Sequence, residues 1–167
     1  MNDAKNQQEA YKQLAEKIKD IKTAMFVTAD ENGELRSRPM RHQTMDDDGT
    51  IWFFTNAPSG KTNEIKQDAH INLSYANPDD QKFVSVSGTA QIVKDQAKID
   101  ELWSPELKAW FPDGKNDPNV ALIRVTPTKG EYWDSPNNVI IHVFGLAKAL
   151  VTGKTYEPGD NQKVSLT

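Results

Sequence analysis

Residues 52–62 read WFFTNAPSGKT, a stretch that joins a run of large apolar side chains to a polar segment typical of a helix start. The apolar run from Ile51 to Phe54 predicts a buried strand. Ser59 can cap a helix that continues to Gln67. Backbone N–H groups at the start of a helix lack partners within the helix and favour an anion. The stretch therefore predicts a strand, a short loop and a helix whose first turn faces an anionic group.

Side chains of the same loop strengthen this prediction. Thr55, Ser59 and Thr62 can donate from their hydroxyl groups, and Lys61 adds a full positive charge. The helix dipole contributes only about 0.3–1 kcal/mol, so the lysine and the hydroxyls must supply most of the affinity. A lysine in the first turn opposes the dipole unless an anion is present, which favours a phosphate site. The alternative is an ordinary Ser59 cap beside a solvated lysine.

A nucleotide-binding P-loop is a sharper alternative, because Gly60, Lys61 and Thr62 match the end of its motif. The first glycine of that motif would fall at position 55, which is Thr55. The same tripeptide recurs at residues 153–155, so it is not specific. The chain also lacks the alternation of strands and helices that a P-loop fold requires. The sequence therefore excludes the P-loop.

The rest of the chain predicts short strands joined by tight turns. An amphipathic helix is expected over residues 7–22, with further helices over 59–67, after Asp95 and from Ser104. Residues 139–151 fit a strand or a helix. Strands are expected over 24–29, 35–45, 51–54, from Asp68 onward, over 82–93 and over 120–133, with turns at 30–33, 46–49 and 77–80.

Helices that are inserted among strands, rather than alternating with them, favour an α+β, mainly β fold. We expect a six-stranded antiparallel closed barrel with peripheral helices. One domain is predicted over residues 1–152, and residues 153–167 are predicted to be a loosely ordered tail. The length of 167 residues fits one domain better than two.

Composition excludes several classes of function. The chain has no cysteine, and its three histidines lie far apart, so no metal site is expected. The net charge of −4 argues against nucleic acid as a partner. No signal peptide or membrane-spanning run is apparent, which predicts a cytoplasmic protein with no membrane partner.

Two further features invite a site interpretation. The extended stretch RSRPMR, residues 36–41, places a proline where it would free neighbouring backbone groups to bond a planar heterocycle. Trp110 and Trp133 fit a core or an interface, with ring stacking on a ligand as a weaker hypothesis. Neither a Ser-His-Asp arrangement nor a pair of catalytic carboxylates is indicated.

Six short motifs in a fixed order give the sequence a family resemblance. They are RPM (38–40), FFTN (53–56), SGK (59–61), FVSVSG (83–88), WFP (110–112) and EYWD (131–134). Over residues 7–135 the chain resembles the FMN-binding split-barrel proteins, the superfamily of pyridoxamine 5′-phosphate oxidase. Within that superfamily it is most similar to the bacterial general stress proteins.

The resemblance implies a six-stranded split barrel, a homodimer, and a flavin in a cleft at the subunit interface. The flavin would be FMN, with FAD as the alternative. The backbone of residues 38–40 would line the isoalloxazine ring, the 55–62 loop would hold the ribityl chain and phosphate, and two tryptophans would form the cleft wall. The implied cofactor-binding residues are Arg38, Pro39, Met40, Thr55, Asn56, Ser59, Gly60, Lys61, Thr62, Trp110 and Trp133.

Departures from the oxidase pattern bear on activity. The oxidase has an arginine where this chain has Gly60 and a glutamine where it has Phe83, and its C-terminal substrate residues have no counterpart after Ser135. The expected function is therefore an FMN-binding protein of the general stress type, with flavin-dependent oxidoreductase or flavin reductase activity as a hypothesis. A pyridoxamine or pyridoxine 5′-phosphate oxidase and a noncatalytic flavin carrier or sensor are the alternatives. No residue is assigned as catalytic.

Overall fold

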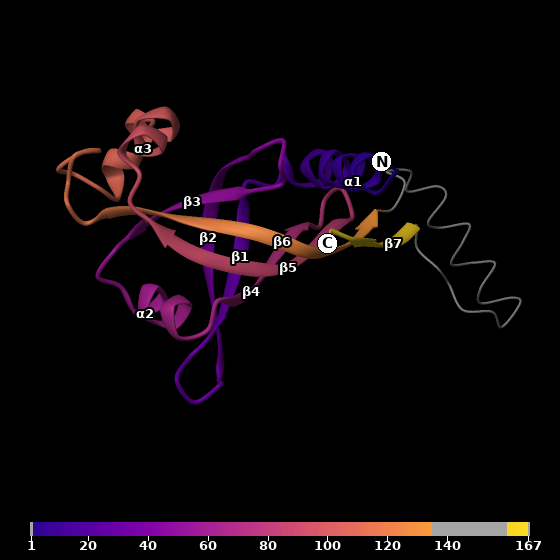
Figure 1. Cartoon of the computed structure of the whole chain (residues 1–167), viewed down its shortest axis with the longest axis horizontal. Coiled ribbons are helices and arrows are strands. Elements are labelled where there is room, and N and C mark those ends of the chain that lie inside the picture. The colour runs from indigo at the N-terminus through magenta and orange to yellow at the C-terminus, as the bar shows by residue number, and fades with distance from the viewer. Residues whose placement is uncertain (1, 135–159, 167) are drawn as a thin grey trace, which may run out of the picture.

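The computed structural model describes residues 2–134 and 160–166, and its elements follow one another as strands with few helices between them (Figure 1). In chain order they are α1 (Asn2–Ile18), β1 (Thr23–Ala29), β2 (Leu35–Met45), β3 (Ile51–Asn56), α2 (Gly60–Gln67), β4 (His70–Asn77), β5 (Lys82–Val93), α3 (Gln96–Leu102), the 3₁₀ helix η1 (Pro105–Ala109), β6 (Val120–Asp134) and β7 (Asp160–Ser165).

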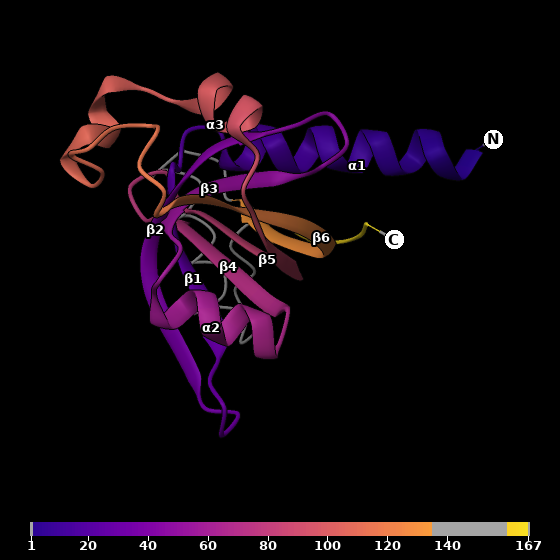
Figure 2. The ribbon, with the colours of Figure 1, turned by 60° about the vertical axis from the view of Figure 1, so that its left-hand side comes forward.

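The strands form one antiparallel sheet that closes on itself. Its order is β3-β2-β1-β4-β5-β6-β7, and an additional pairing of β3 with β6 closes a ring of six strands. The closing register runs from Ile51 opposite Val125 to Asn56 opposite Val120. The predicted six-stranded antiparallel barrel with peripheral helices is confirmed. Figure 2 shows α2 and α3 on opposite sides of this barrel.

Alternation along the strands fills the barrel interior. Ala24, Phe26 and Thr28 of β1 are buried, because successive side chains of a strand point to opposite faces. Phe26 meets Phe53 edge to face, with ring centroids 5.2 Å apart. Leu14 and Ile18 of α1 complete the same buried cluster at one side.

A second apolar cluster explains why the run at 51–54 is apolar at every position. Trp52 and Phe54 point out of the barrel and pack with Ile99 of α3 and with Leu107 and Phe111 of the η1 region. The side chain of Asp95 caps α3 by accepting from the Lys98 N–H at 3.2 Å. β3 is therefore covered on both faces, which holds η1 close to the barrel wall.

The chain's last described segment differs from the expected loose tail. Residues 160–165 form β7, which pairs with residues 129–134 of β6. This part of β6 lies beyond its pairing with β3, so its edge is open to another strand. Gln7 and Tyr11 of α1 both donate hydrogen bonds to the carbonyl oxygen of Leu166, which fixes the end of the segment. The element expected over 139–151 and the tail residues 153–159 lie outside the described residues.

No helix in the described part of the chain is both long and apolar enough to cross a membrane.

Candidate functional site

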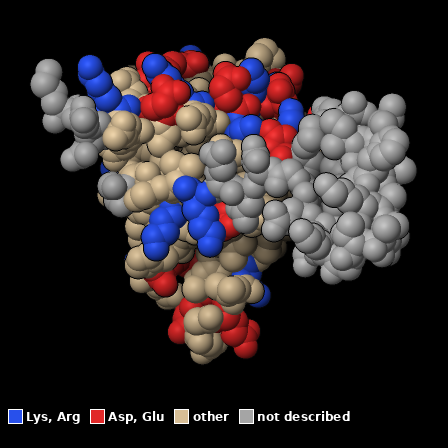
Figure 3. Space-filling model, turned by 90° about the vertical axis from the view of Figure 1, so that its right-hand side faces the viewer, with Lys and Arg blue, Asp and Glu red and all other residues tan. Residues whose placement is uncertain are grey.

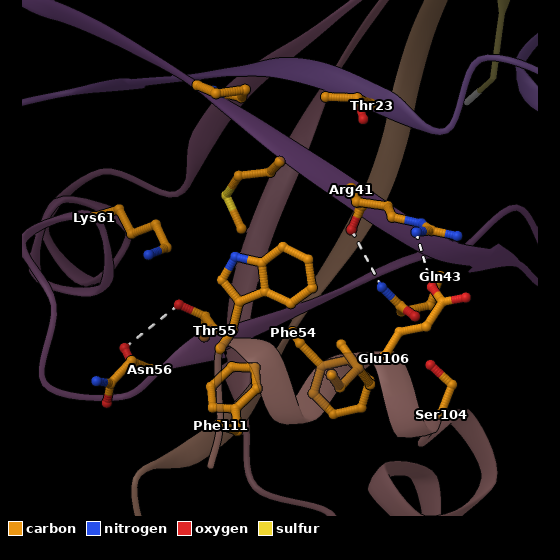
Figure 4. A pocket seen from close by; sticks show the side chains of 14 residues that line it. Thr23, Arg41, Gln43, Phe54, Thr55, Asn56, Lys61, Ser104, Glu106 and Phe111 are labelled. Atoms are coloured by element: carbon orange, nitrogen blue, oxygen red, sulfur yellow. Dashed lines mark hydrogen bonds and ion pairs between the residues drawn. The ribbon is translucent and has the colours of Figure 1, made fainter.

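A cavity of about 640 Å³ opens between β2 and the η1 segment, beside the loop that follows β3 (Figure 4). Six residues predicted from the sequence line it: Pro39, Met40, Thr55, Asn56, Lys61 and Trp110. They come from β2, from β3 and the α2 helix that follows it, and from the end of η1. The volume falls within the range of natural small-molecule pockets.

The β2 wall of this cavity has an open backbone edge. β2 pairs with β1 from Leu35 to Arg41, whereas its pairing with β3 begins only at His42. The His42 N–H bonds to the Lys22 carbonyl at 3.0 Å, so by alternation the polar groups of Pro39 and Arg41 face away from β1. Pro39 has no N–H to lose at such a position. The Pro39 carbonyl and the Arg41 N–H can therefore bond to a ligand without disturbing the sheet, whereas Met40 bonds to β1 and the Arg41 carbonyl accepts from the Gln43 amide at 3.4 Å.

Internal hydrogen bonds shape the loop between β3 and α2. The Thr62 hydroxyl donates to the Asn56 carbonyl oxygen at 3.2 Å and lies 2.5 Å from the Ser59 hydroxyl. Because the Thr62 proton is used, Ser59 donates in the second contact. Thr62 is fully buried, so its hydroxyl holds the loop together rather than facing the cavity. Ser59 occupies the N-cap position of α2 without a side-chain capping bond.

Lys61 is the cationic group at the α2 end of the cavity, where its side chain reaches inward from the helix (Figure 4). It is half-buried, and burial is the main cause that lowers its pKa, followed by the positive charge of Arg38. Among the described residues it forms no ion pair with a carboxylate. A half-buried ammonium without a counter-ion, beside the free N–H groups of a helix start, fits a phosphate group.

The middle of the cavity is apolar and its other end is polar. Met40, Phe54 and Phe111 line the middle, together with Trp110, which is 69% exposed. At the end away from Lys61, Arg41 forms an ion pair of 3.1 Å with Glu106 (Figure 4). An elongated cavity with a cation at one end and aromatic walls fits a planar ring that carries a phosphate.

Some predicted residues lie away from this cavity. The Arg38 side chain turns toward α2, where its guanidinium bonds to Glu64 and Thr28. Ser59, Gly60 and Thr62 belong to the adjoining loop and first turn. Trp133 lies on β6 opposite Phe83 of β5. It is twelve positions along β6 from Ala121, the residue that pairs with Thr55 at the cavity, so Trp133 is remote from the cavity.

The sequence prediction missed other lining residues. They are Thr23, Arg41, Gln43, Phe54, Ser104, Glu106, Leu107 and Phe111. Half of them belong to the η1 segment, which only tertiary packing brings to the barrel. The neighbouring aromatic pair Trp110 and Phe111 was the one local signal of a cavity wall there.

The charge on the surface is mixed. On the face shown in Figure 3, basic and acidic side chains are mixed along the upper part, basic ones form a small group near the middle, and acidic ones gather at the lower tip. The hairpin between β1 and β2 carries Asp30, Glu31 and Glu34 at that end. This face presents no extended basic surface.

A protein-family model and a known protein both match most of this chain. The family model described as "Pyridoxamine 5′-phosphate oxidase like" matches residues 9–157. Protein bli-3 of Neurospora crassa is 37% identical over 158 residues, which cover 84% of this chain and 76% of that protein.

Solved structures share the fold. A candidate general stress protein 26 from Jannaschia sp. CCS1 has a TM-score of 0.72 and 25% identity, with 99% of each chain covered. The general stress FMN/FAD binding protein of Xanthomonas citri has a TM-score of 0.62 and 30% identity, with 78% of this chain and 89% of that chain covered.

Proposed function

The chain belongs to the pyridoxamine 5′-phosphate oxidase-like family, and from this membership and the cavity we propose that it binds a flavin, FMN with FAD as the alternative. The observation that carries the proposal is the half-buried Lys61 at the cavity end next to the α2 start. The Xanthomonas citri structure, a general stress FMN/FAD binding protein, supports the same ligand class.

The chemistry of the lining residues suggests how a flavin would lie. Lys61, the Ser59 hydroxyl and the first N–H groups of α2 would hold the phosphate. Met40 and Trp110 would pack on the isoalloxazine ring, whose polar edge would bond to the Pro39 carbonyl and the Arg41 N–H. Ser59 would have to turn its hydroxyl from Thr62 toward the phosphate.

Any redox activity would rest on the flavin itself, which supplies hydride and electron chemistry when bound. The titratable residues lining the cavity are Arg41, Lys61 and Glu106, and two of these pair with each other. The protein would therefore supply position and electrostatics. This arrangement suits a flavin-dependent oxidoreductase or flavin reductase of the general stress type, and a noncatalytic carrier or sensor is the alternative.

We also infer a homodimer with the cavity near its interface. Met25, Phe83 and Trp133 are large apolar side chains exposed on the outer face of the sheet. Phe83 and Trp133 are direct cross-strand partners, so they form one patch. Pairing of this face between two copies would bury the patch and could bring the partner subunit's Trp133 toward the cavity.

The direct test is mass spectrometry of the ligand released from purified protein, followed by titration with FMN and riboflavin. Lys61→Ala should weaken FMN about tenfold or more, as expected for a lost charge-assisted hydrogen bond, and should leave riboflavin nearly unchanged. Lys66→Ala, which removes an exposed lysine from the same helix, is the matched control. Equal losses for FMN and riboflavin in Lys61→Ala would contradict the phosphate role.

Activity assays separate the functional alternatives. Steady consumption of NADH or NADPH by the flavin-loaded protein would support the reductase, and no turnover with any donor would support the carrier. Formation of pyridoxal 5′-phosphate from pyridoxamine 5′-phosphate would establish the oxidase instead.

A further inference from the structure

Glu64 is a buried carboxylate on α2, one helical turn after Lys61. It is 6% exposed, although it carries a charged group. Its Oε2 accepts from the Thr28 hydroxyl and, at 2.9 Å, from Arg38. Arg38 also donates to the Thr28 hydroxyl oxygen at 2.6 Å, so the three groups close a triangle. A buried charge with this many donors is held in one place.

The triangle joins α2 to two strands of the barrel. Thr28 lies on β1, Arg38 on β2 and Glu64 on α2. Burial alone would raise the pKa of Glu64, but the Thr28 hydroxyl, the Arg38 guanidinium and a further contact from Arg36 at 3.4 Å outweigh burial and hold the pKa below its usual range. The carboxylate therefore stays ionised at neutral pH. Ile65 packs into the core beside it, so α2 has one apolar and one ionic attachment.

The same groups act on Lys61 without bonding to it. The Arg38 charge lowers the pKa of Lys61 and the Glu64 charge raises it. Neither Arg38 nor Glu64 lines the cavity. The charge pair that joins α2 to β2 thus acts electrostatically on the lysine at this end of the cavity.

We propose that Glu64 is a positioning residue of the phosphate site: its carboxylate, bonded to Arg38 and Thr28, sets the place of the α2 start and so aims Lys61 into the cavity. The inference rests on the proposed function, because it concerns the same flavin phosphate. It assigns to Glu64 an effect on phosphate recognition without contact with the ligand.

A purely electrostatic role of Glu64 and a positioning role predict opposite changes in FMN affinity for Glu64→Gln. If Glu64 acted only through its charge, its removal would leave the site more positive, and FMN would bind more tightly. If Glu64 positions Lys61, the neutral amide cannot form the ion pairs with Arg36 and Arg38 that attach α2 to β2, and FMN binds more weakly. A role confined to packing would weaken FMN and riboflavin alike.

The experiment titrates FMN and riboflavin into flavin-free wild type and variants, following quenching of flavin fluorescence. We expect Glu64→Gln to weaken FMN about tenfold and riboflavin less than about threefold. Glu31→Gln, which makes the same charge change on the exposed hairpin, should leave both affinities unchanged. Tighter FMN binding, or parallel losses of both ligands, would overturn the proposal.

Two further variants extend the test, and the first of them keeps it valid even if Glu64→Gln folds poorly. Thr28→Val removes one donor and keeps the ion pair, so it should weaken FMN selectively by a smaller factor. The double variant Arg38→Gln and Glu64→Gln also removes the Arg38 charge and should recover part of the FMN affinity lost in Glu64→Gln. No selective loss in Thr28→Val, or no recovery in the double variant, would count against positioning.

Measurements on the wild type distinguish a failure of the proposed phosphate site from a failure of the proposed role of Glu64. A wild type that binds FMN no more tightly than riboflavin overturns the proposed phosphate site, and the positioning role with it. A wild type that prefers FMN, with the same preference in Glu64→Gln, leaves the proposed function standing and removes only the role of Glu64.

Discussion

The Thr62 hydroxyl donates to the carbonyl oxygen of Asn56 across 3.2 Å, which ties the first turn of α2 to the end of β3. Thr62 is fully buried, and its oxygen also accepts from Ser59. The threonine predicted to hold a phosphate therefore holds the loop that would present the other phosphate groups.

Thr62→Val should destabilise the protein even without flavin. Valine keeps the shape but removes the hydroxyl that bonds to the Asn56 carbonyl and to the Ser59 hydroxyl, at a cost of about 1–2 kcal/mol. Urea unfolding of the flavin-free protein measures the effect. Ser59→Ala, which removes only the outer hydroxyl, should cost less. A flavin-free Thr62→Val as stable as wild type would mean that the loop does not rely on this bond.

Gly60→Arg should tighten FMN binding. Nothing lies within 4 Å of a Cβ built at Gly60, so a side chain fits without moving the helix start. An arginine there would add a second cation beside Lys61, where charge-assisted bonds to phosphate oxygens can form. We expect about a tenfold gain for FMN, measured by fluorescence titration.

The companion measurements for Gly60 separate charge from backbone effects. Gly60→Ala should change FMN affinity little, and riboflavin should bind equally to wild type and to Gly60→Arg. Tighter binding of riboflavin as well would show that the arginine acts on the ring or the fold rather than on the phosphate.

Most of the barrel could be predicted because its signals are local. The turns on either side predicted β2 at its observed bounds, Leu35–Met45, and the apolar stretch after the 77–80 turn predicted β5 at Lys82–Val93. The strand β7 could not be predicted in this way. Its pairing depends on the part of β6 that extends beyond β3, and that opening arises only when the barrel closes.

The candidate site likewise has a part that local sequence predicts and a part that only the fold brings together. The loop from Thr55 to Lys61 is contiguous, so its chemistry is visible in the sequence. Glu64 looks like an ordinary helix carboxylate there, because its burial comes from Thr28 and Arg38 on two other elements. Pairing with Arg38 also explains why that guanidinium does not line the cavity.

Trp110→Ala should weaken flavin binding with little effect on stability. The Trp110 side chain lines the cavity but is 69% exposed, so little packing is lost when it is removed. We expect a change in the free energy of unfolding within about 0.5 kcal/mol, typical of surface sites, and a clear loss of affinity for both FMN and riboflavin. Urea unfolding and flavin titration measure the two effects.

Trp103→Ala is the contrasting variant. Trp103 packs against Phe54 and Phe111, with ring centroids 5.8 and 6.3 Å apart, so its loss should cost about 3 kcal/mol or more. If Trp110→Ala destabilised the flavin-free protein as much as Trp103→Ala, the exposed position of Trp110 would be refuted.

His42 should make stability fall as the pH is lowered below neutrality. It lies inside the barrel between Phe53 and Tyr75, and burial, with smaller effects of Arg41 and Lys22, lowers its pKa to about 4. In the unfolded chain a histidine titrates near 6.5. Between pH 6.5 and about 4 the unfolded chain thus binds the proton that the native protein excludes, so unfolding becomes easier as the pH falls.

The loss attributable to His42 can reach about 3 kcal/mol over this window. The buried carboxylate Glu64 has a lowered pKa and contributes only at lower pH, so measurements from pH 7 to pH 4.5 isolate the histidine. We expect His42→Phe, which keeps a ring against Phe53, to show a much flatter dependence in urea unfolding over that range. The same slope in wild type and His42→Phe would show that His42 is not the group that titrates, and would place the sensitivity elsewhere in the barrel.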